Sequence, residues 1–239
     1  MAEALLLDLG GTLVDGLRAA DLCSHWARSG LRLEPRRVAA IIFRTDLRYM
    51  ELEPGLWHQR GAEFQRRYWG DVHEAMGLGL ETPPSEVTRL WGGHWRRYQD
   101  VPAALQLARR SGLRLGLVSN WDLGGRKVLQ EAGLLDAFEV LAFSAELGWE
   151  KPDPRLFRWA ADRLGLPVQA CTYVGDNFWD DVVGARMAGM EAILLHRYPE
   201  WAALPSGPNT PVVTDLRQAV LYLGGRRGPR PATGLRVPA

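Results

Sequence analysis

The chain has 239 residues, 46% of them hydrophobic and 24% charged, and carries a formal net charge of +1. This is the composition of an ordinary globular protein, and so balanced a charge gives no general reason to expect nucleic acid or an acidic membrane surface as a partner. The two cysteines, Cys23 and Cys171, are far apart and support neither a disulfide framework nor a cysteine zinc site.

Neither an export signal nor a membrane span is expected from the sequence. The first residues do not form a basic segment followed by a long apolar stretch, and no run of about 18 apolar residues occurs. We expect a cytoplasmic protein of one domain, or one domain interrupted by an insertion, with no membrane or nucleic-acid partner. The oligomeric state is unknown from the sequence. Arginine supplies nearly every basic side chain, so the two lysines, Lys127 and Lys151, stand out.

The first predicted element is a buried strand that begins at Ala4 and delivers Asp8 into a loop. Its leucine-rich run is bounded by Gly10 and Gly11, and such runs are typical of parallel strands covered on both faces. A carboxylate at the end of a buried strand needs a partner. Asp8 is therefore either a turn or capping residue or part of a site, and the polar ends of later strands favour a site.

Residues 16–99 form a predicted all-helical insertion of about four helices. The insertion holds five of the ten tryptophans and four of the five histidines, and the simplest interpretation is a compact bundle with tryptophan in its core. The histidines lack the spacing of a helical metal pair, so we expect no zinc. Glycine and proline signals separate the predicted helices, which are Leu17–Ser29, Pro35–Met50, Gly55–Met76 and Ser85–Tyr98.

From Val101 onward, predicted helices alternate with strands. This alternation predicts right-handed crossovers and a doubly wound parallel α/β sheet with helices on both faces. Ligands of such sheets bind beyond the carboxyl ends of the strands, where the strand order reverses. Ser119 and Asp176 each follow a strand, so they should converge with Asp8 at one edge of the sheet. The predicted strands are Leu113–Val118, Phe138–Phe143, Cys171–Val174 and Glu191–Leu195.

These strand ends would gather several carboxylates in one crevice, where like charges raise one another's pKa unless a cation intervenes. Mg²⁺ accepts carboxylates, a backbone carbonyl and water as ligands, and it commonly serves phosphate chemistry. The turn of residues 10–12 can present backbone N–H groups to an anion, and Lys151 would add a compact positive charge. The carboxylates concerned are Asp8, Asp176, Asp180 and Asp181.

Four segments of the chain resemble a known family. They are similar, in the same chain order, to the four motifs of the haloacid dehalogenase-like (HAD) hydrolase superfamily. The segments are AspLeuGlyGlyThrLeuValAsp from position 8, LeuValSerAsn from 117, LysProAspProArgLeuPhe from 151 and ValGlyAspAsnPheTrpAspAspValValGlyAla from 174. The resemblance implies a Rossmann-like core with strand order 5-4-1-2-3, formed by residues 1–15 and 100–223, and a helical cap formed by residues 16–99. Residues 224–239 are expected to be a flexible basic tail.

The resemblance also implies roles for single residues. Asp8 would be the nucleophile that takes the phosphoryl group of a small phosphorylated substrate, Ser119 would bind a phosphoryl oxygen, and Lys151 would hold the nucleophile. Further substrate-binding residues would be Gly11, Thr12 and Asn120, and the Mg²⁺ ligands would be Asp8, the backbone carbonyl of Gly10, Asp176 and Asp181.

One position departs from the phosphatases of the superfamily. They resemble AspXaaAspXaaThr, with the second Asp as general acid and base, and this chain has Gly10 there. Loss of a general acid or base costs about 10²–10⁴-fold in rate. Esters whose alkoxide leaves badly therefore become poor substrates, whereas acyl and aryl phosphates remain suitable. Asp122, Asp180 or the cap residue His58 are candidates to replace the missing acid.

Three functions fit these residues. The first is a Mg²⁺-dependent hydrolase of phosphate esters or acyl phosphates that works through Asp8. The second is a binding or regulatory protein that keeps the pocket but turns over little, for which Gly10 is the argument. The third is a 2-haloacid dehalogenase, since a halide leaves without a proton. Dehalogenases, however, resemble a pattern with serines where this chain has Gly175-Asp176, because they need no metal. Phosphonate-cleaving members use a cap lysine, and residues 16–99 contain none.

Overall fold

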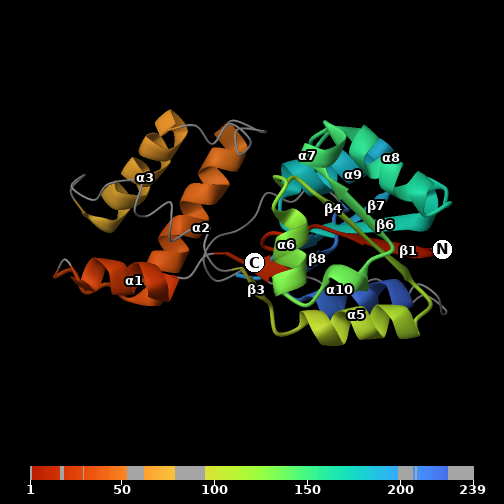
Figure 1. The fold of residues 1–239 in the computed structure, drawn as a ribbon, viewed down its shortest axis with the longest axis horizontal. Coiled ribbons are helices and arrows are strands. Elements are labelled where there is room, and N and C mark those ends of the chain that lie inside the picture. The colour runs from red at the N-terminus through yellow and green to blue at the C-terminus, as the bar shows by residue number, and fades with distance from the viewer. Residues whose placement is uncertain are drawn as a thin grey trace.

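The computed structural model describes residues 2–16, 19–28, 30–52, 62–78, 95–198, 207 and 209–225, and its centre is a six-stranded sheet (Figure 1). The strand order is β5-β4-β1-β6-β7-β8, and all neighbours are parallel. From β7 to β5 this is the predicted order 5-4-1-2-3, and β8 extends the sheet beyond β7. The strands are β1 (Ala4–Leu7), β4 (Arg114–Ser119), β5 (Val140–Phe143), β6 (Cys171–Gly175), β7 (Glu191–Leu195) and β8 (Val212–Val213).

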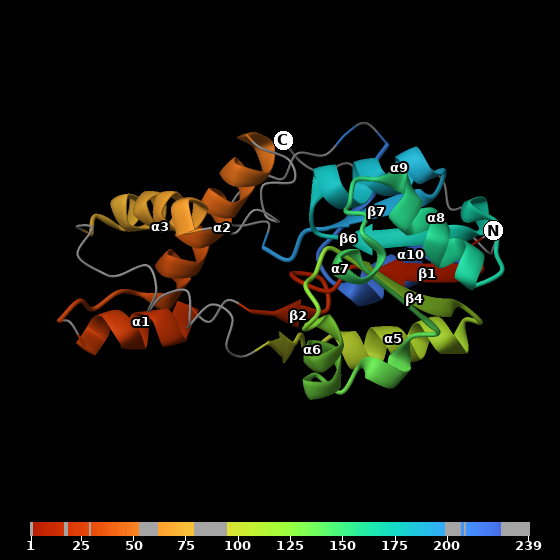
Figure 2. The ribbon, with the colours of Figure 1, turned by 45° about the horizontal axis from the view of Figure 1, so that its top comes forward.

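Helices cover both faces of the sheet, which confirms the doubly wound α/β fold (Figures 1 and 2). One face carries α5, α6 and α10, and the other carries α8 and α9. The chain runs from β1 to β4 and β5, then crosses to β6 on the other side of β1, so the strand order reverses beside β1. The helices are α5 (Val101–Arg110), α6 (Gly125–Glu131), α7 (Ser144–Leu147), α8 (Pro154–Arg163), α9 (Gly184–Ala188) and α10 (Leu216–Gly225), with short turns η2 (Leu135–Ala137), η3 (Val168–Ala170) and the π-helical η4 (Phe178–Val183).

The central strand β1 is apolar along its whole length because both of its faces are covered. Leu5 and Leu7 belong to the core cluster under α5 and α10, while Ala4 and Leu6 belong to the cluster under α8 and α9. All four side chains are fully buried. Burying a leucine stabilises a fold by roughly 1.5–3 kcal/mol, so this strand fixes Asp8, the residue that follows it, firmly in the middle of the sheet.

In the described part of the insertion, three helices form a separate body beside the sheet (Figures 1 and 2). They are inserted between β2 (Val14–Asp15) and β3 (Arg96–Arg97), and they share an aromatic cluster that contains Trp26, Tyr68 and Trp69. A contact with the core is made by Phe43, whose ring stacks on His196 with 5.8 Å between centroids and an interplanar angle of 10°. The helices are α1 (Ala19–Arg28), α2 (Pro35–Leu52) and α3 (Ala62–Met76).

The predicted helix Ser85–Tyr98 is wrong at its C-terminal end. Arg96 and Arg97 form β3, which pairs antiparallel with Val14 and Asp15, so the segments that leave and re-enter the core meet as a two-stranded ribbon. The helical spacing of Trp95 and Tyr98 has another cause, since both side chains pack against the core. Residues 53–61 and 79–94 lie outside the described residues, as do residues 226–239. The predicted tail of residues 224–239 begins too early, because Gly224 and Gly225 belong to α10.

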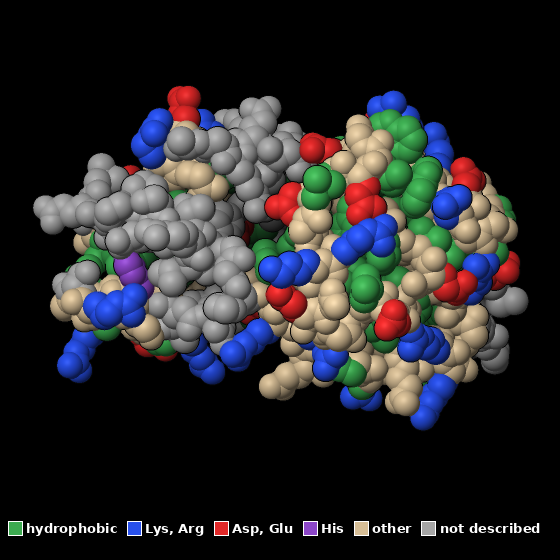
Figure 3. All heavy atoms as spheres, viewed as in Figure 1, with side chains coloured by type: hydrophobic (Ala, Val, Ile, Leu, Met, Phe, Trp, Pro, Cys, Tyr) green, Lys and Arg blue, Asp and Glu red, His purple; other side chains and the backbone are tan. Residues whose placement is uncertain are grey.

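The face of the core seen in Figure 3 carries basic and acidic side chains interspersed with hydrophobic ones. Neighbouring opposite charges form pairs such as Arg114 with Glu139, at 2.6 Å, and Arg126 with Glu146, at 2.7 Å. None of the helices in the described part of the chain has both the length and the apolar character that crossing a membrane requires.

Candidate active site

Asp8 lies at the C-terminal end of β1. Leu7 pairs with Leu117 of β4 on one side and with Val174 of β6 on the other, so the residues that follow the three strands meet at one edge. Asp8 is 6% exposed, and its Oδ1 accepts a hydrogen bond from Ser119 Oγ at 2.9 Å. The topology thus joins two residues that are 111 positions apart in the sequence.

Lys151 is 4% exposed and lies among carboxylates. Its Nζ donates to Asp8 Oδ1 at 2.7 Å, to Asp181 Oδ1 at 2.6 Å and to the Tyr173 hydroxyl at 3.1 Å. Sequence reasoning missed Tyr173, because in the sequence it looks like one more hydrophobic residue of a buried strand. Only the structure shows that its hydroxyl contacts Lys151. The other lysine, Lys127, is 79% exposed on α6, so the rarity of lysine was a useful signal at one position of two.

Opposing charges determine the ionisation of this group. Burial alone would lower the pKa of Lys151, but the charges of Asp181 and Asp8 outweigh it and raise that pKa above its ordinary value. Burial also raises the pKa of Asp8, against the effect of Lys151. Burial, followed by the charges of Asp8 and Asp181, raises the pKa of Asp176 well above its ordinary value. One lysine among two buried carboxylates and the half-buried Asp176 leaves an excess of negative charge that a divalent cation would neutralise.

A group of carboxylates is able to hold that cation. Oxygens of Asp8, Asp176 and Asp181 lie within 4.8 Å of one another. Asp181 also has local partners, because its Oδ2 accepts the backbone N–H of Asn177 at 2.9 Å and its Oδ1 faces Lys151. Hard oxygen donors in this number suit Mg²⁺, which is bound through few carboxylates and retains water. The residues present therefore fit the predicted ion.

The loop after Asp8 approaches Asp176 closely. Thr12 Oγ1 donates to Asp176 Oδ1 at 3.3 Å. Gly11 has a φ of 69°, and a β-carbon there would lie 2.2 Å from Asp176 Oδ2, so the position requires glycine. Arg197, which no motif pointed to, holds the loop from its other side by donating to the carbonyls of Gly11 at 3.2 Å and Thr12 at 2.6 Å.

Asn120 fixes the segment that carries Lys151. Its Nδ2 donates to the Lys151 carbonyl at 3.0 Å, and its Oδ1 accepts the Lys151 N–H at 2.7 Å. Directly afterwards α8 begins, with the side chain of Asp153 accepting the N–H of Arg155 at 2.9 Å as a helix cap. The contacts of Asn120 give it a positioning role, whereas the resemblance implies substrate binding.

The three candidates for the missing acid lie in different surroundings. Asp122 is exposed and accepts the N–H of Gly124 at 2.8 Å within a turn. Asp180 is 7% exposed, and burial, opposed by Lys151, raises its pKa to about 7. His58 lies outside the described residues. Asp180 is thus the better shielded of the two candidates that the structure describes.

The space beside Gly10 is taken by Trp121. A β-carbon at position 10 would lie 3.0 Å from Cζ3 of the indole. The ring of Trp95 packs against this indole edge-on, with 4.6 Å between centroids and an interplanar angle of 65°. Sequence reasoning missed Trp121, although an aromatic residue directly after the predicted SerAsn strand end was a signal that it belongs to the site.

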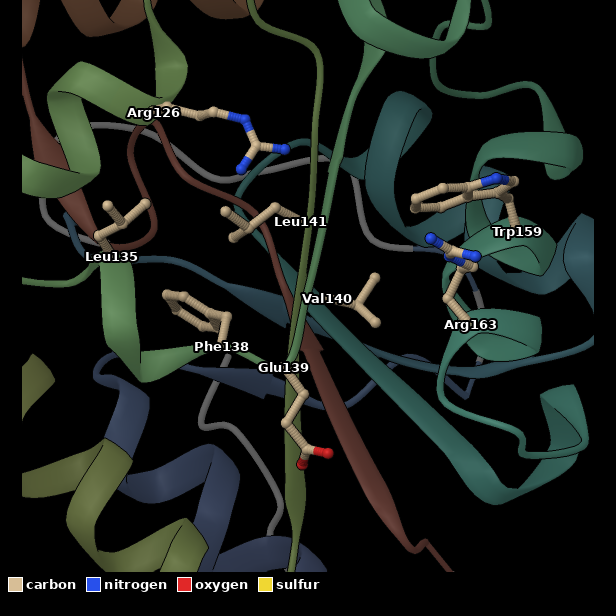
Figure 4. Close-up of a pocket in the computed structure, with 8 residues that line it drawn as sticks. All are labelled: Arg126, Leu135, Phe138, Glu139, Val140, Leu141, Trp159 and Arg163. Atoms are coloured by element: carbon tan, nitrogen blue, oxygen red, sulfur yellow. The ribbon is translucent and has the colours of Figure 1, made fainter.

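A cavity of about 410 Å³ opens elsewhere, along the edge strand β5 (Figure 4). Figure 4 shows Trp159 and Arg163 of α8 on one side of this strand and Arg126 and Leu135 on the other. The residues that line the cavity do not include any of the clustered carboxylates, so the chemistry lies at the strand ends and not here. The lining residues are Arg126, Leu135, Phe138, Glu139, Val140, Leu141, Trp159 and Arg163.

Comparison with known proteins identifies the family. The family model described as haloacid dehalogenase-like hydrolase matches residues 2–189. The chain belongs to this family. A glyceraldehyde 3-phosphate phosphatase of Methanopyrus kandleri is 37% identical over 207 residues, which cover 82% of this chain and 85% of the relative. A phosphoserine phosphatase of Thermus thermophilus is 39% identical over 166 residues, or 66% of this chain and 64% of the relative, so that match spans less than two thirds of the relative.

The HAD fold alone does not identify the reaction. A crystal structure of an L-2-haloacid dehalogenase superposes with a TM-score of 0.67 at 18% identity, covering 93% of this chain and 99% of the dehalogenase. At this identity the likeness is one of fold. This chain is similar both to dehalogenases and to proteins named as phosphatases. The choice between the two reactions therefore rests on the residues of the site.

Proposed function

We propose that this HAD protein is a Mg²⁺-dependent hydrolase that cleaves a small phosphorylated metabolite through an aspartyl-phosphate on Asp8. The observation that supports it is the arrangement around Asp8, whose Oδ1 contacts both Ser119 and Lys151 while Asp176 and Asp181 lie in the same group. The relatives named as phosphatases support the same class of reaction.

Each residue has a part in this proposal. Asp8 attacks the phosphorus in line, and Ser119 Oγ orients the carboxylate and a phosphoryl oxygen. Lys151, kept charged by its two carboxylate partners, stabilises the negative charge on the transferred oxygens. When bound, Mg²⁺ would neutralise phosphoryl charge. Its proposed ligands are Asp8, the Gly10 carbonyl, Asp176 and Asp181, with Thr12 and Gly11 shaping the loop and Asn120 positioning Lys151.

A second candidate follows from Gly10, which has no proton to give. A protein with this pocket and no general acid would bind phosphorylated ligands while hardly consuming them. Such ligands would then raise the melting temperature by mass action without phosphate release. The third candidate, a dehalogenase, is weakened by Asp176, because a metal-binding carboxylate has no use in that reaction.

Phosphate release from alkyl, aryl and acyl phosphates tests the proposal, with Mg²⁺ or EDTA, in the wild type, Asp8→Asn and Asp136→Asn. Asp136 is an exposed aspartate in η2 and serves as the matched control. We expect Mg²⁺-dependent release that falls at least about 10³-fold in Asp8→Asn and stays unchanged in the control. Undiminished release in Asp8→Asn, or metal-independent chloride release from 2-haloacids by the wild type, would overturn it.

A further inference from the structure

We propose that Trp121, backed by Trp95, puts an aromatic wall in the place of the general acid. The substrate accordingly is a phosphate ester whose leaving group is a planar aromatic ring that departs without a proton. This inference rests on the proposed hydrolysis through Asp8 and names the class of substrate for that site.

The wall and the glycine beneath it are matched in shape. A β-carbon at Gly10 would point at the benzo edge of Trp121, 3.0 Å from Cζ3 and 3.7 Å from Cη2. An aspartate at position 10 would bring its β-carbon into this close contact, so the indole of Trp121 would have to give by a few tenths of an ångström. The absence of a side chain at Gly10 and the position of the Trp121 ring are therefore complementary. An apolar ring lies beside the position where the phosphatases have their second aspartate.

Contacts on several sides hold Trp121 in this position. Its backbone N–H donates to Ser144 Oγ at 3.0 Å, and its carbonyl accepts the N–H of Ala145 at 3.2 Å. Trp95 supports the ring from the side, and Trp95 itself lies over a glycine, because a β-carbon at Gly16 would be 2.3 Å from its Cζ3. Gly10 thus leaves room for the indole of Trp121, and Gly16 leaves room for that of Trp95. The position of both rings is therefore matched by the residues around them.

Trp121 lies beside the loop that follows Asp8, and in this proposal the leaving group lies against its indole. Gly10 is two residues after Asp8, which receives the phosphoryl group, and Trp95 lies on the segment that returns from the cap. Both indoles pack partly against the core cluster and are partly exposed, so each keeps some surface for a ligand. Stacked or edge-to-face aromatic pairs add about 0.5–1.5 kcal/mol to area burial, which corresponds to a few-fold to about 10-fold in affinity.

The chemistry of an aromatic ester suits a site that has no carboxylate at position 10. A carboxylate oxygen of Asp8 bonds to phosphorus while the phosphorus–oxygen bond to the ring breaks, and the electron pair of that bond stays on the phenolate. A phenolate is a weak base and leaves without a proton, whereas an alkoxide does not. Water then adds its oxygen to the aspartyl-phosphate, which releases inorganic phosphate and the Asp8 carboxylate, and the proton of the water passes to phosphate or solvent.

Leaving-group dependence tests the proposal. Phenyl phosphates of graded phenol acidity are compared with cyclohexyl phosphate in the wild type, Trp121→Ala, Trp121→Phe, Gly10→Asp and the double variant Gly10→Asp/Trp121→Ala. Trp159→Ala is the matched control, a partly exposed tryptophan of α8 at the β5 cavity.

We expect wild-type kcat/KM to rise steeply with phenol acidity and to be at least about 10²-fold lower for cyclohexyl phosphate. Trp121→Ala should raise KM for phenyl phosphates about 3- to 10-fold, Trp121→Phe should keep most of the preference, and Trp159→Ala should match the wild type. The double variant should gain more activity on cyclohexyl phosphate than Gly10→Asp alone, because removal of the indole relieves the close contact at the new β-carbon.

The outcomes separate this inference from the proposed function. Equal turnover of phenyl and cyclohexyl phosphate by the wild type, with activity that depends on Asp8, would overturn the proposed role of Trp121. The proposed hydrolysis through Asp8 would still hold. If phosphate release fails altogether, binding still decides. Phenylphosphonate should raise the melting temperature more than methylphosphonate in the wild type and Trp159→Ala, and no more than methylphosphonate in Trp121→Ala. Equal shifts in the wild type would overturn the proposal.

Discussion

The core and the cap bury different chemistry. The core buries charges, and Lys151 is in contact with both Asp8 and Asp181. The cap buries mainly aromatic rings. Buried polar atoms without a hydrogen-bond partner among the described residues occur in both regions, Trp26 Nε1 and His73 Nε2 in the cap and Asp180 Oδ1 and Thr210 Oγ1 in the core. The charged group around Lys151 therefore depends on complementary partners at fixed positions, while the aromatic interior of the cap depends more on volume and shape.

This difference explains what each region reveals about function. A buried charge without its partner is costly, so residue types in the core are restricted at each strand end, and such restriction produces motifs that can be read. Aromatic packing accepts one large ring in place of another, so the sequence of the cap does not name a substrate. The class of reaction is thus readable from the core, and specificity has to be argued from contacts such as those of Trp121.

The largest expected effect comes from breaking the charged group of the core. Lys151→Met keeps much of the side-chain volume but leaves Asp8 and Asp181 without their buried cation. We expect a loss of about 3–5 kcal/mol in the free energy of unfolding, measured by urea titration in EDTA, together with loss of phosphate release. The matched control is Lys127→Met, whose exposed pair should contribute less than about 0.5 kcal/mol. Equal losses in the two variants would contradict the comparison.

The sheet could be predicted because its strands are apolar runs that end in polar residues. β1, buried on both faces, reads as continuous leucine up to Asp8, and the helices between later strands dictate parallel order. The ribbon at Arg96 and Arg97 could not be predicted. Two exposed arginines carry no strand pattern, and their pairing with Val14 and Asp15 depends on where the cap returns to the core.

The same contrast holds within the site. The residues that topology gathers, Asp8, Ser119 and Lys151, end strands or follow them and could be named. Tyr173 could not, because its hydroxyl contacts Asp181 across a turn while its position in β6 looks like any buried one. Arg197 could not be named either, because it donates to backbone carbonyls. Every residue has such a carbonyl, so the contact does not restrict which residue types occur there.

A smaller effect is expected from two tryptophans of the cap that differ in one hydrogen bond. Trp26 and Trp69 are both fully buried, and Trp69 Nε1 donates to Gln65 Oε1 at 3.2 Å, whereas Trp26 Nε1 is unpaired among the described residues. Both changes to phenylalanine remove ring volume, but Trp26→Phe also removes an unsatisfied buried donor. Trp69→Phe should therefore cost about 1 kcal/mol more, measured by thermal unfolding of both variants. The reverse order would show that volume alone governs the cap.

The smallest expected effect is a pH dependence of the cap. Burial, and then the charge of His25, lowers the pKa of His73, whose ring lies 5.8 Å from that of Trp26. A folded-state pKa below the ordinary value means that the unfolded chain takes up the proton first as the pH falls. The stability due to neutral His73 is therefore fully present above the ordinary histidine pKa and is lost as the pH falls below it.

His73→Phe keeps an aromatic ring and removes this titration. We expect the free energies of unfolding of the wild type and the variant to differ by a constant above about pH 7.5, and the wild type to lose stability faster below about pH 6. Urea titrations across this range measure the difference, and the high-pH offset is the internal control for the change of side chain. Parallel pH slopes would mean that acid acts on the carboxylates of the core, and that the neutral, aromatic interior of the cap is insensitive to pH.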